Sequence, residues 1–214
     1  HLNRNPFSEH TPKQFYQVNG AAGQYQISSQ AIIPLEEESG FGIIASDKNS
    51  ASDNQNGTYF IELFIDGRLI YSSVWEKFSF EHSRGINSHI DHPALILTGK
   101  RIQKSFIEPG NELTIYKNSV NTGLINSTDQ NIHEAKYVVK DIAGNESVLN
   151  FKVRFDPVPK KSLKQLEGKK MPFNQINTFD TTGLRITFPL KTLFSNLNFV
   201  YSKSPRPIGG YSPI

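Results

Sequence analysis

The chain has 214 residues, which is enough for one large domain or two small ones with a sizeable core. Hydrophobic residues make up 36% and charged residues 20% of it, and the formal net charge is +3, a composition that is ordinary for a globular protein and does not indicate general disorder. Cysteine is absent, which excludes disulfides and thiolate metal sites. No run approaches the roughly 20 apolar residues of a membrane helix.

The first part of the chain is polar, and we expect residues 1–23 to form a lead-in segment. The chain opens at His1 without a charged and an apolar leader region, so we expect any targeting segment to have been removed or to lie upstream. Candidate strands follow at residues 24–27 and 31–35, and Pro34 restricts the second one to a sheet edge or a strand end.

The clearest local signal is a hairpin between Thr58 and Tyr71. Two apolar runs flank Asp66-Gly67, a dipeptide that favours a two-residue turn because both positions tolerate positive φ. With such a turn we expect Ile65 opposite Arg68, Phe64 opposite Leu69, Leu63 opposite Ile70 and Glu62 opposite Tyr71. Both faces of this hairpin are partly apolar, so we expect cover on each side.

Further short strands are predicted after the hairpin. Residues 74–80 carry Trp75, Phe78 and Phe80, which need cover, and residues 113–116 and 135–140 follow. Residues 149–155 alternate between apolar and polar side chains, the pattern of a half-buried strand. Short strands spaced by about ten residues predict an immunoglobulin-like antiparallel β-sandwich over residues 24–155, without a helix of useful length.

A change of composition marks a boundary after the sandwich. Residues 156–172 are rich in Pro and Lys, and we interpret them as a linker. The basic cluster there favours a solvated linker over a nucleic-acid footprint, so no nucleic-acid partner is expected. Alternation at 184–188 and 197–201 predicts a second, apparently incomplete β unit over residues 173–214.

The densest set of potential metal ligands is His82, His89, Asp91 and His92. Imidazoles and a carboxylate are zinc ligands, although His89 and His92 would converge only on a helix. The competing interpretation is a polar connection before Pro93 whose imidazoles are exposed or make ordinary hydrogen bonds. A Gly-x-Ser-x-Gly elbow, a nucleotide-binding glycine loop and a His-Glu-x-x-His motif are all absent.

Aromatic side chains offer a second kind of candidate site. Tyr71, Trp75 and Tyr116 are possible contacts for a carbohydrate or a protein partner. Aromatic residues in a sandwich more often belong to the core, and only an exposed coplanar pair would favour binding.

Several motifs, taken in order, resemble a known family. They are the Gly40-Phe41-Gly42 strand, the hairpin, Ser88-His89-Ile90-Asp91, residues 101–116 and the Asp141-x-x-Gly144-Asn145-x-Ser147 turn. This order is similar to the region that follows the catalytic domain in lysostaphin-like zinc metallopeptidases of Bacteroidota. The resemblance covers about residues 24–155 and is looser from Phe188 onwards.

The family holds zinc with a His-x-x-x-Asp pair and a later His-x-His, and neither motif occurs in this chain. None of the family's catalytic residues can therefore be assigned here. The resemblance implies a non-catalytic accessory sandwich, exported to the periplasm or associated with the outer membrane. It also implies that zinc belongs to an upstream catalytic domain and that this chain itself holds no cofactor.

Three hypotheses follow from these patterns. The first is an accessory module of a peptidoglycan-hydrolysing zinc endopeptidase. It would position the upstream peptidase domain or bind another envelope protein, with peptidoglycan as a further candidate ligand. The second is a stand-alone carbohydrate- or protein-binding envelope module. The third is a metal-binding protein that uses His82, His89, Asp91 and His92.

Overall fold

The computed structural model describes residues 2–3, 14–27, 31–35, 38–48, 55–127, 129–156 and 168–203. Strands dominate these residues and helices are few, which confirms the predicted all-β, sandwich-like fold. None of the helices in these ranges is long and apolar enough to cross a membrane.

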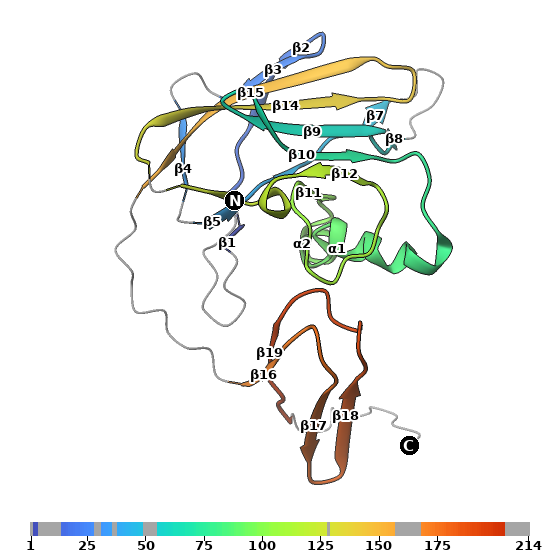
Figure 1. The fold of residues 1–214 in the computed structure, drawn as a ribbon. Coiled ribbons are helices and arrows are strands. Elements are labelled where there is room, and N and C mark those ends of the chain that lie inside the picture. The colour runs from blue at the N-terminus through green and yellow to red at the C-terminus, as the bar shows by residue number, and fades with distance from the viewer. Residues whose placement is uncertain are drawn as a thin grey trace, which may run out of the picture.

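One large sheet forms the first layer (Figure 1). Its strands pair in the order β12 (Tyr116–Ser119), β10 (Arg68–Val74), β9 (Phe60–Ile65), β14 (Ile132–Lys140), β15 (Glu146–Phe155), β3 (Gln24–Ile27) and β2 (Val18–Ala21). β4 (Ile32–Leu35) also pairs with β15.

The outer edge of β15 is paired in a way that the sequence did not predict. Both β3 and β4 run parallel to β15, with Leu149 opposite Tyr25 and Val153 opposite Ile33. The expected sheet was wholly antiparallel, so these two pairs are exceptions to it. Pro34 lies opposite Arg154 at this sheet edge, as expected for a residue without a backbone N–H.

The β9–β10 hairpin forms around Asp66-Gly67, with one correction to its register. Ile65 faces Arg68 and Phe64 faces Leu69 as predicted, but Leu63 faces Tyr71 and not Ile70. Ile70 is the extra residue of a β-bulge, and the strand is shifted by one position beyond it. The shift places Tyr71 on the buried side beside Leu63, and both side chains have 0% exposure.

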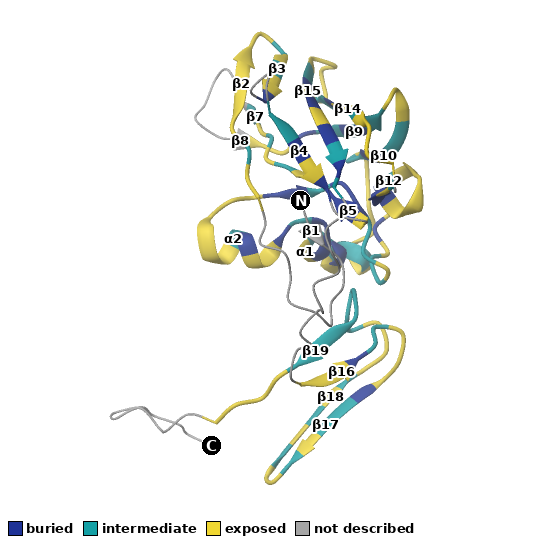
Figure 2. Ribbon diagram, turned by 90° about the vertical axis from the view of Figure 1, so that its left-hand side faces the viewer, coloured by how far each residue is buried: buried dark blue, intermediate teal, exposed yellow. Residues whose placement is uncertain are grey.

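Short elements make the second layer, beneath the large sheet in Figures 1 and 2. They are β1 (Leu2–Asn3), β5 (Glu38–Gly40) and β13 (Ile125–Asn126) in one sheet, and β6 (Gly42–Ile43) with β11 (Gln103–Lys104) in another. β7 (Asp47–Lys48) pairs with β8 (Gln55–Asn56), and η2 spans Asn121–Gly123.

The expectation of no helix in this region was wrong for residues 80–98. They form η1 (Phe80–Gly85), α1 (Ile86–His89) and α2 (His92–Thr98), which we call the helical segment. Each piece is too short to show a helical period, which explains why the sequence pattern missed them. Phe80, expected to need cover, is 91% exposed, and the strand expected from Leu113 begins only at Tyr116.

The core lies on the inner face of the large sheet. Alternate residues of β15 are buried, as their period of two predicted. They pack with residues of β4, β9, β10 and β14 and of the second layer, which include Ile33, Leu35, Ile61, Leu63, Tyr71, Phe41 and Ile125. Figure 2 shows these buried positions as dark bands along the central strands.

Among the described residues, no second layer lies over the outer face of the hairpin, contrary to expectation. Phe60 and Phe64 are half-buried there, and lysines of the adjacent strand cover their rings. The Lys136 Nζ atom lies 4.8 Å from the Phe64 ring centroid, and the Lys140 Nζ atom lies 5.5 Å from that of Phe60. Long basic side chains thus shield apolar surface while their charges stay in water.

Residues 168–203 form a second β unit, which we call the C-terminal unit. β16 (Lys169–Met171) pairs with β19 (Leu197–Phe199), and β17 (Asn177–Thr181) pairs with β18 (Leu184–Phe188). Residues 169–171 were expected within the linker, and here they form a strand of this unit. Most of the linker, and residues 204–214, lie outside the described ranges.

A few polar contacts join the C-terminal unit to the sandwich. The Gly110 N–H donates to the Phe194 carbonyl at 2.8 Å. Arg84 donates from Nη2 to the Thr192 carbonyl at 2.9 Å and lies over the Phe194 ring at 4.4 Å. Lys191 and Glu112 form an ion pair at 2.7 Å.

Candidate functional site

Residues from two separately predicted sites meet in one cluster, which we call the His89 cluster. The ring centroids of Trp75 and His89 lie 5.2 Å apart, and those of His89 and Tyr116 lie 6.0 Å apart. Tyr71 contacts Tyr116 edge-on at 6.0 Å. Strand β10 supplies Tyr71, Trp75 follows that strand, α1 supplies His89 and β12 begins with Tyr116.

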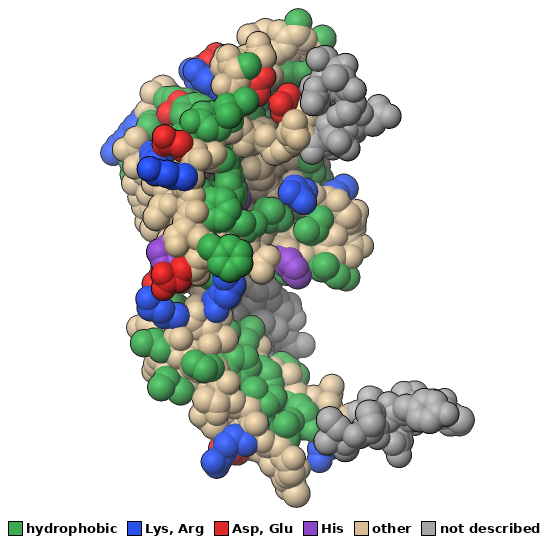
Figure 3. Space-filling view, turned by 90° about the vertical axis from the view of Figure 1, so that its right-hand side faces the viewer, with side chains coloured by type: hydrophobic (Ala, Val, Ile, Leu, Met, Phe, Trp, Pro, Cys, Tyr) green, Lys and Arg blue, Asp and Glu red, His purple; other side chains and the backbone are tan. Residues whose placement is uncertain are grey.

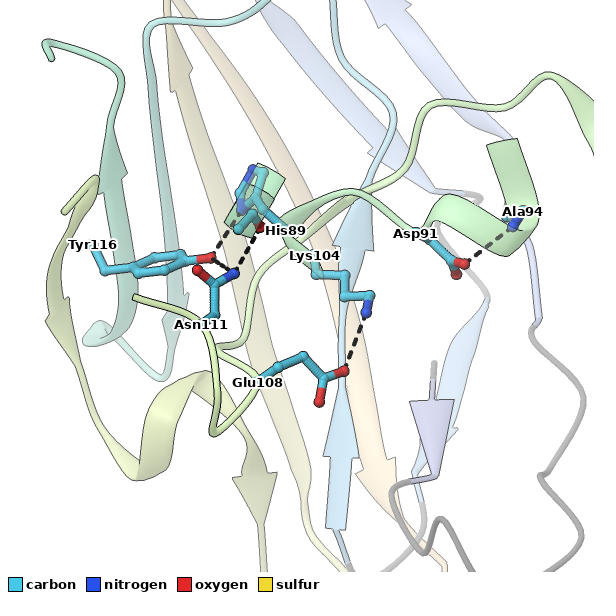
Figure 4. A network of polar contacts seen from close by, with 8 residues as sticks. His89, Asp91, Ala94, Lys104, Glu108, Asn111 and Tyr116 are labelled. Atoms are coloured by element: carbon cyan, nitrogen blue, oxygen red, sulfur yellow. Dashed lines mark hydrogen bonds and ion pairs between the residues drawn. The ribbon is translucent and has the colours of Figure 1, made fainter. Parts of the chain in front are cut away.

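Asn111 is the polar centre of this cluster (Figure 4). Its Nδ2 atom donates to the Tyr116 hydroxyl at 2.9 Å and to the Gly85 carbonyl at 3.0 Å, while its Oδ1 accepts from the Leu113 N–H at 3.0 Å. A Cβ on Gly85 would lie 2.6 Å from this Oδ1, so the close approach requires glycine. Asn111 thereby fastens the helical segment to the sheet.

Burial sets the protonation of the cluster. Desolvation lowers the pKa of His89 to about 4, because the charged imidazolium loses its water. Desolvation also raises the pKa values of Tyr71 and Tyr116. At neutral pH the cluster therefore holds a neutral imidazole and un-ionised phenols, and its interior has no charged nucleophile or acid.

The other members of the predicted metal set lie apart from His89. Asp91 is 3% exposed and caps α2, where its Oδ1 accepts from the Ala94 N–H at 3.1 Å (Figure 4). His92 is exposed at the first position of α2, and His82 is half-buried in η1. His89 ends α1, and the extended Ile90 separates the two helices, so His89 and His92 do not share one.

The separation of these four residues argues against the metal hypothesis. In the described ranges, no three His, Cys, Asp or Glu side chains come close enough together to hold a metal ion. His89 and Asp91 are both engaged in fixing the helical segment. The structure therefore does not gather the four residues into one ligand set.

The predicted binding aromatics do not form a platform. Tyr71 is fully buried, Trp75 and Tyr116 are half-buried, and the rings meet edge-on or tilted. An exposed coplanar pair, the arrangement that would favour carbohydrate binding, is not formed by these three residues. Their arrangement is that of a core cluster.

Sequence reasoning missed a half-open apolar cavity of about 160 Å³ at the edge of the sandwich. Its walls come from residues 14–18, from β3 and β6, and from the inner face of the large sheet. Phe15, Tyr16, Phe41 and Phe151 supply aromatic surface, and Asp91 is its single acidic lining residue among those described.

Comparisons of this chain with family models, with curated proteins and with solved structures gave no significant match.

Proposed function

We propose that this chain is a non-catalytic accessory region of a cell-envelope zinc metalloendopeptidase of the peptidoglycan-hydrolase type. It positions an upstream catalytic domain, which carries the zinc, or it binds another envelope protein or peptidoglycan. The protein is then exported, to the periplasm or the outer membrane. The observation that carries this proposal is that the chemically capable residues His89 and Asp91 serve to fix the helical segment.

The motifs behind the resemblance have structural roles, which supports a scaffold. A Cβ on Gly40 would lie 2.5 Å from the Phe106 ring, and one on Gly42 would lie 2.6 Å from Ile102. Asp141 Oδ1 accepts from the Asn145 N–H at 2.9 Å and shapes the β14–β15 turn. Close packing and turn geometry are roles of this kind, and they stabilise the fold of the sandwich.

The test has two parts. The gene upstream of His1 should encode a His-x-x-x-Asp pair followed by His-x-His, and the purified chain should not clear a suspension of peptidoglycan when zinc is added. Zinc-dependent clearing by the chain alone would overturn the proposal. Stoichiometric zinc in elemental analysis, lost in His89→Ala, would favour the metal-binding hypothesis instead.

The apolar cavity favours a second candidate, a stand-alone binding module for an envelope carbohydrate or protein. A cavity of about 160 Å³ with aromatic walls can hold one apolar group of a ligand or one side chain of a partner. If the upstream gene lacks the zinc motifs, this becomes the leading function. Phe41→Ala should then weaken retention of the partner in a pull-down from envelope extract.

A further inference from the structure

The C-terminal unit has an open aromatic cluster. We give this name to Phe179, Phe188, Phe199 and Tyr201, which come from β17, β18, β19 and the residues after β19. The Phe199 ring centroid lies 5.0 Å from that of Phe179 and 5.7 Å from that of Phe188, and Tyr201 lies 5.5 Å from Phe179. None of the four rings is buried.

The pairing of β17 and β18 puts further apolar side chains beside these rings. Phe179 is opposite Ile186 and Thr181 is opposite Leu184, so Leu184 and Ile186 share a face with Phe179 and Phe188. The opposite face carries Asp180 and Arg185, which form an ion pair. The hairpin is therefore amphipathic, with one apolar face.

This apolar surface lacks a core to bury it. Within residues 168–203, only Met171 and Asn177 are buried (Figure 2). Figure 3 shows hydrophobic side chains running along this unit on the visible face. Pairs of two-stranded sheets are marginally stable alone, and exposed apolar clusters of this kind mark interaction sites.

Charge indicates what the unit contacts. The C-terminal unit, residues 168–203, contains five Lys or Arg and one Asp or Glu, whereas the rest of the chain contains eighteen Lys or Arg and nineteen Asp or Glu. Lys169 lies on the strand opposite Phe199, and the exposed Lys203 follows Tyr201 by two residues. Two such basic units would repel each other, so the charge disfavours a face-to-face contact between copies and favours an anionic partner.

The ring geometry favours lipid over single-stranded nucleic acid. Bases stack on open ring faces, but these rings pack on one another with interplanar angles of 47° to 69°. Leu184 and Ile186 add aliphatic surface, which suits acyl chains. Aromatic and aliphatic side chains bordered by lysines are typical of surfaces that lie at the boundary of an anionic bilayer.

We propose that the open aromatic cluster docks the C-terminal unit on an anionic lipid surface. The rings and Leu184 enter the headgroup region, while Lys169 and Lys203 contact the lipid phosphates. This inference is independent of the accessory role proposed above, because it uses no residue of the sandwich.

The test is co-sedimentation of the full chain with vesicles of phosphatidylcholine alone or mixed with phosphatidylglycerol. We expect binding only to the mixed vesicles. The double variant Leu184→Ser/Tyr201→Ser should lower the partition coefficient about tenfold or more, from the apolar area lost to the membrane. Lys203→Glu should also weaken binding, and that variant removes no apolar contact from the unit.

The matched control is Phe80→Ser, which removes a 91% exposed ring from the helical segment, outside the C-terminal unit. It should bind like the unmodified chain. Equal binding to neutral vesicles, no binding to either kind, or an equal loss in the control would each overturn the proposal. Binding of an oligothymidine in preference to the mixed vesicles would assign the surface to nucleic acid.

Discussion

The Nδ1 atom of His133 lies 2.6 Å from Oδ2 of Asp66, the first residue of the Asp-Gly turn. The other carboxylate oxygen of Asp66 accepts from the Glu134 N–H at 2.9 Å. A single aspartate thus both forms the hairpin turn and attaches it to the neighbouring strand β14. Its φ of 48° is a conformation that asparagine also tolerates.

Asp66→Asn tests this attachment without straining the turn. The hydrogen bond from His133, followed by the one from the Glu134 N–H, lowers the pKa of Asp66 below its ordinary value. A lowered carboxyl pKa contributes stability above the ordinary pKa, and this contribution is lost as the pH falls through the lowered value. We expect Asp66→Asn to cost about 0.5 kcal/mol at neutral pH, because the Asp66 side chain is more than half exposed to water.

Urea unfolding at neutral pH and at about pH 3 measures this cost. The difference between Asp66→Asn and the unmodified chain should shrink in acid. Asp66→Ala should cost more than Asp66→Asn, because alanine at a positive φ is strained. A constant difference at both pH values would contradict the role assigned to the carboxylate.

His89 should make the fold sensitive to mild acid. Its pKa is lowered to about 4 by burial, so the unfolded chain binds a proton more readily than the folded one. The free energy of unfolding is therefore unaffected by His89 protonation above about pH 6.5, and it declines as the pH falls from there toward about 4. His89→Phe should keep the packing against Trp75 and remove this decline.

His89→Ala is the companion variant, and the cavity it leaves should cost about 3 kcal/mol. Guanidinium unfolding at about pH 7 and about pH 5 measures both effects. If His89→Phe lost as much stability as the unmodified chain between these two pH values, the acid sensitivity would have to come from another group.

Gly110→Ala should detach the C-terminal unit from the sandwich. A Cβ there would lie 2.6 Å from the Leu193 carbonyl oxygen and 2.9 Å from the Phe194 Cα atom, and both are backbone atoms that cannot simply turn aside. Small-angle scattering should show a larger radius of gyration for the variant. The control is Gly57→Ala, because a Cβ at Gly57 meets nothing within 4 Å. Unchanged scattering from Gly110→Ala would contradict the close contact.

Substitutions of two phenylalanines, one in the core and one at the surface, test the assigned burial. Phe151 is 8% exposed and contacts Phe41 edge-on at 5.4 Å, so Phe151→Ala should cost about 3 to 5 kcal/mol. Phe80 is 91% exposed, and Phe80→Ala should change stability by less than about 0.5 kcal/mol. Thermal unfolding of the two variants side by side gives the comparison, and similar losses would contradict the assigned burial.

The sequence predicted those parts of the fold that short-range patterns determine. The Asp66-Gly67 turn and the alternation along β15 follow from neighbouring residues. The bulge at Ile70 could not be predicted, because it depends on burying Tyr71 against partners elsewhere in the chain. The short helices of residues 80–98 carry no period, and tertiary packing stabilises them.

The structure brings together residues that the sequence patterns divided between two candidate sites. His89 was assigned to a metal set and Trp75 and Tyr116 to a binding set, yet the three rings contact one another. Asn111, which fixes the Tyr116 hydroxyl, gave no signal beyond its place in a Pro-Gly-Asn turn. Such contacts join residues that are distant in sequence, so they cannot be predicted from local sequence patterns.

The parallel pairing of β4 with β15 imposes an order on folding. Ile32 faces Lys152, which lies 120 positions later in the chain, whereas β14 and β15 are joined by a short turn. Closing the long loop carries an entropic penalty that the local hairpins do not have. During synthesis, the β9–β10 hairpin can form early. β3 and β4 can pair only after β15, which ends at Phe155, has been synthesised. β3 and β4 are therefore among the last strands of the sandwich to fold.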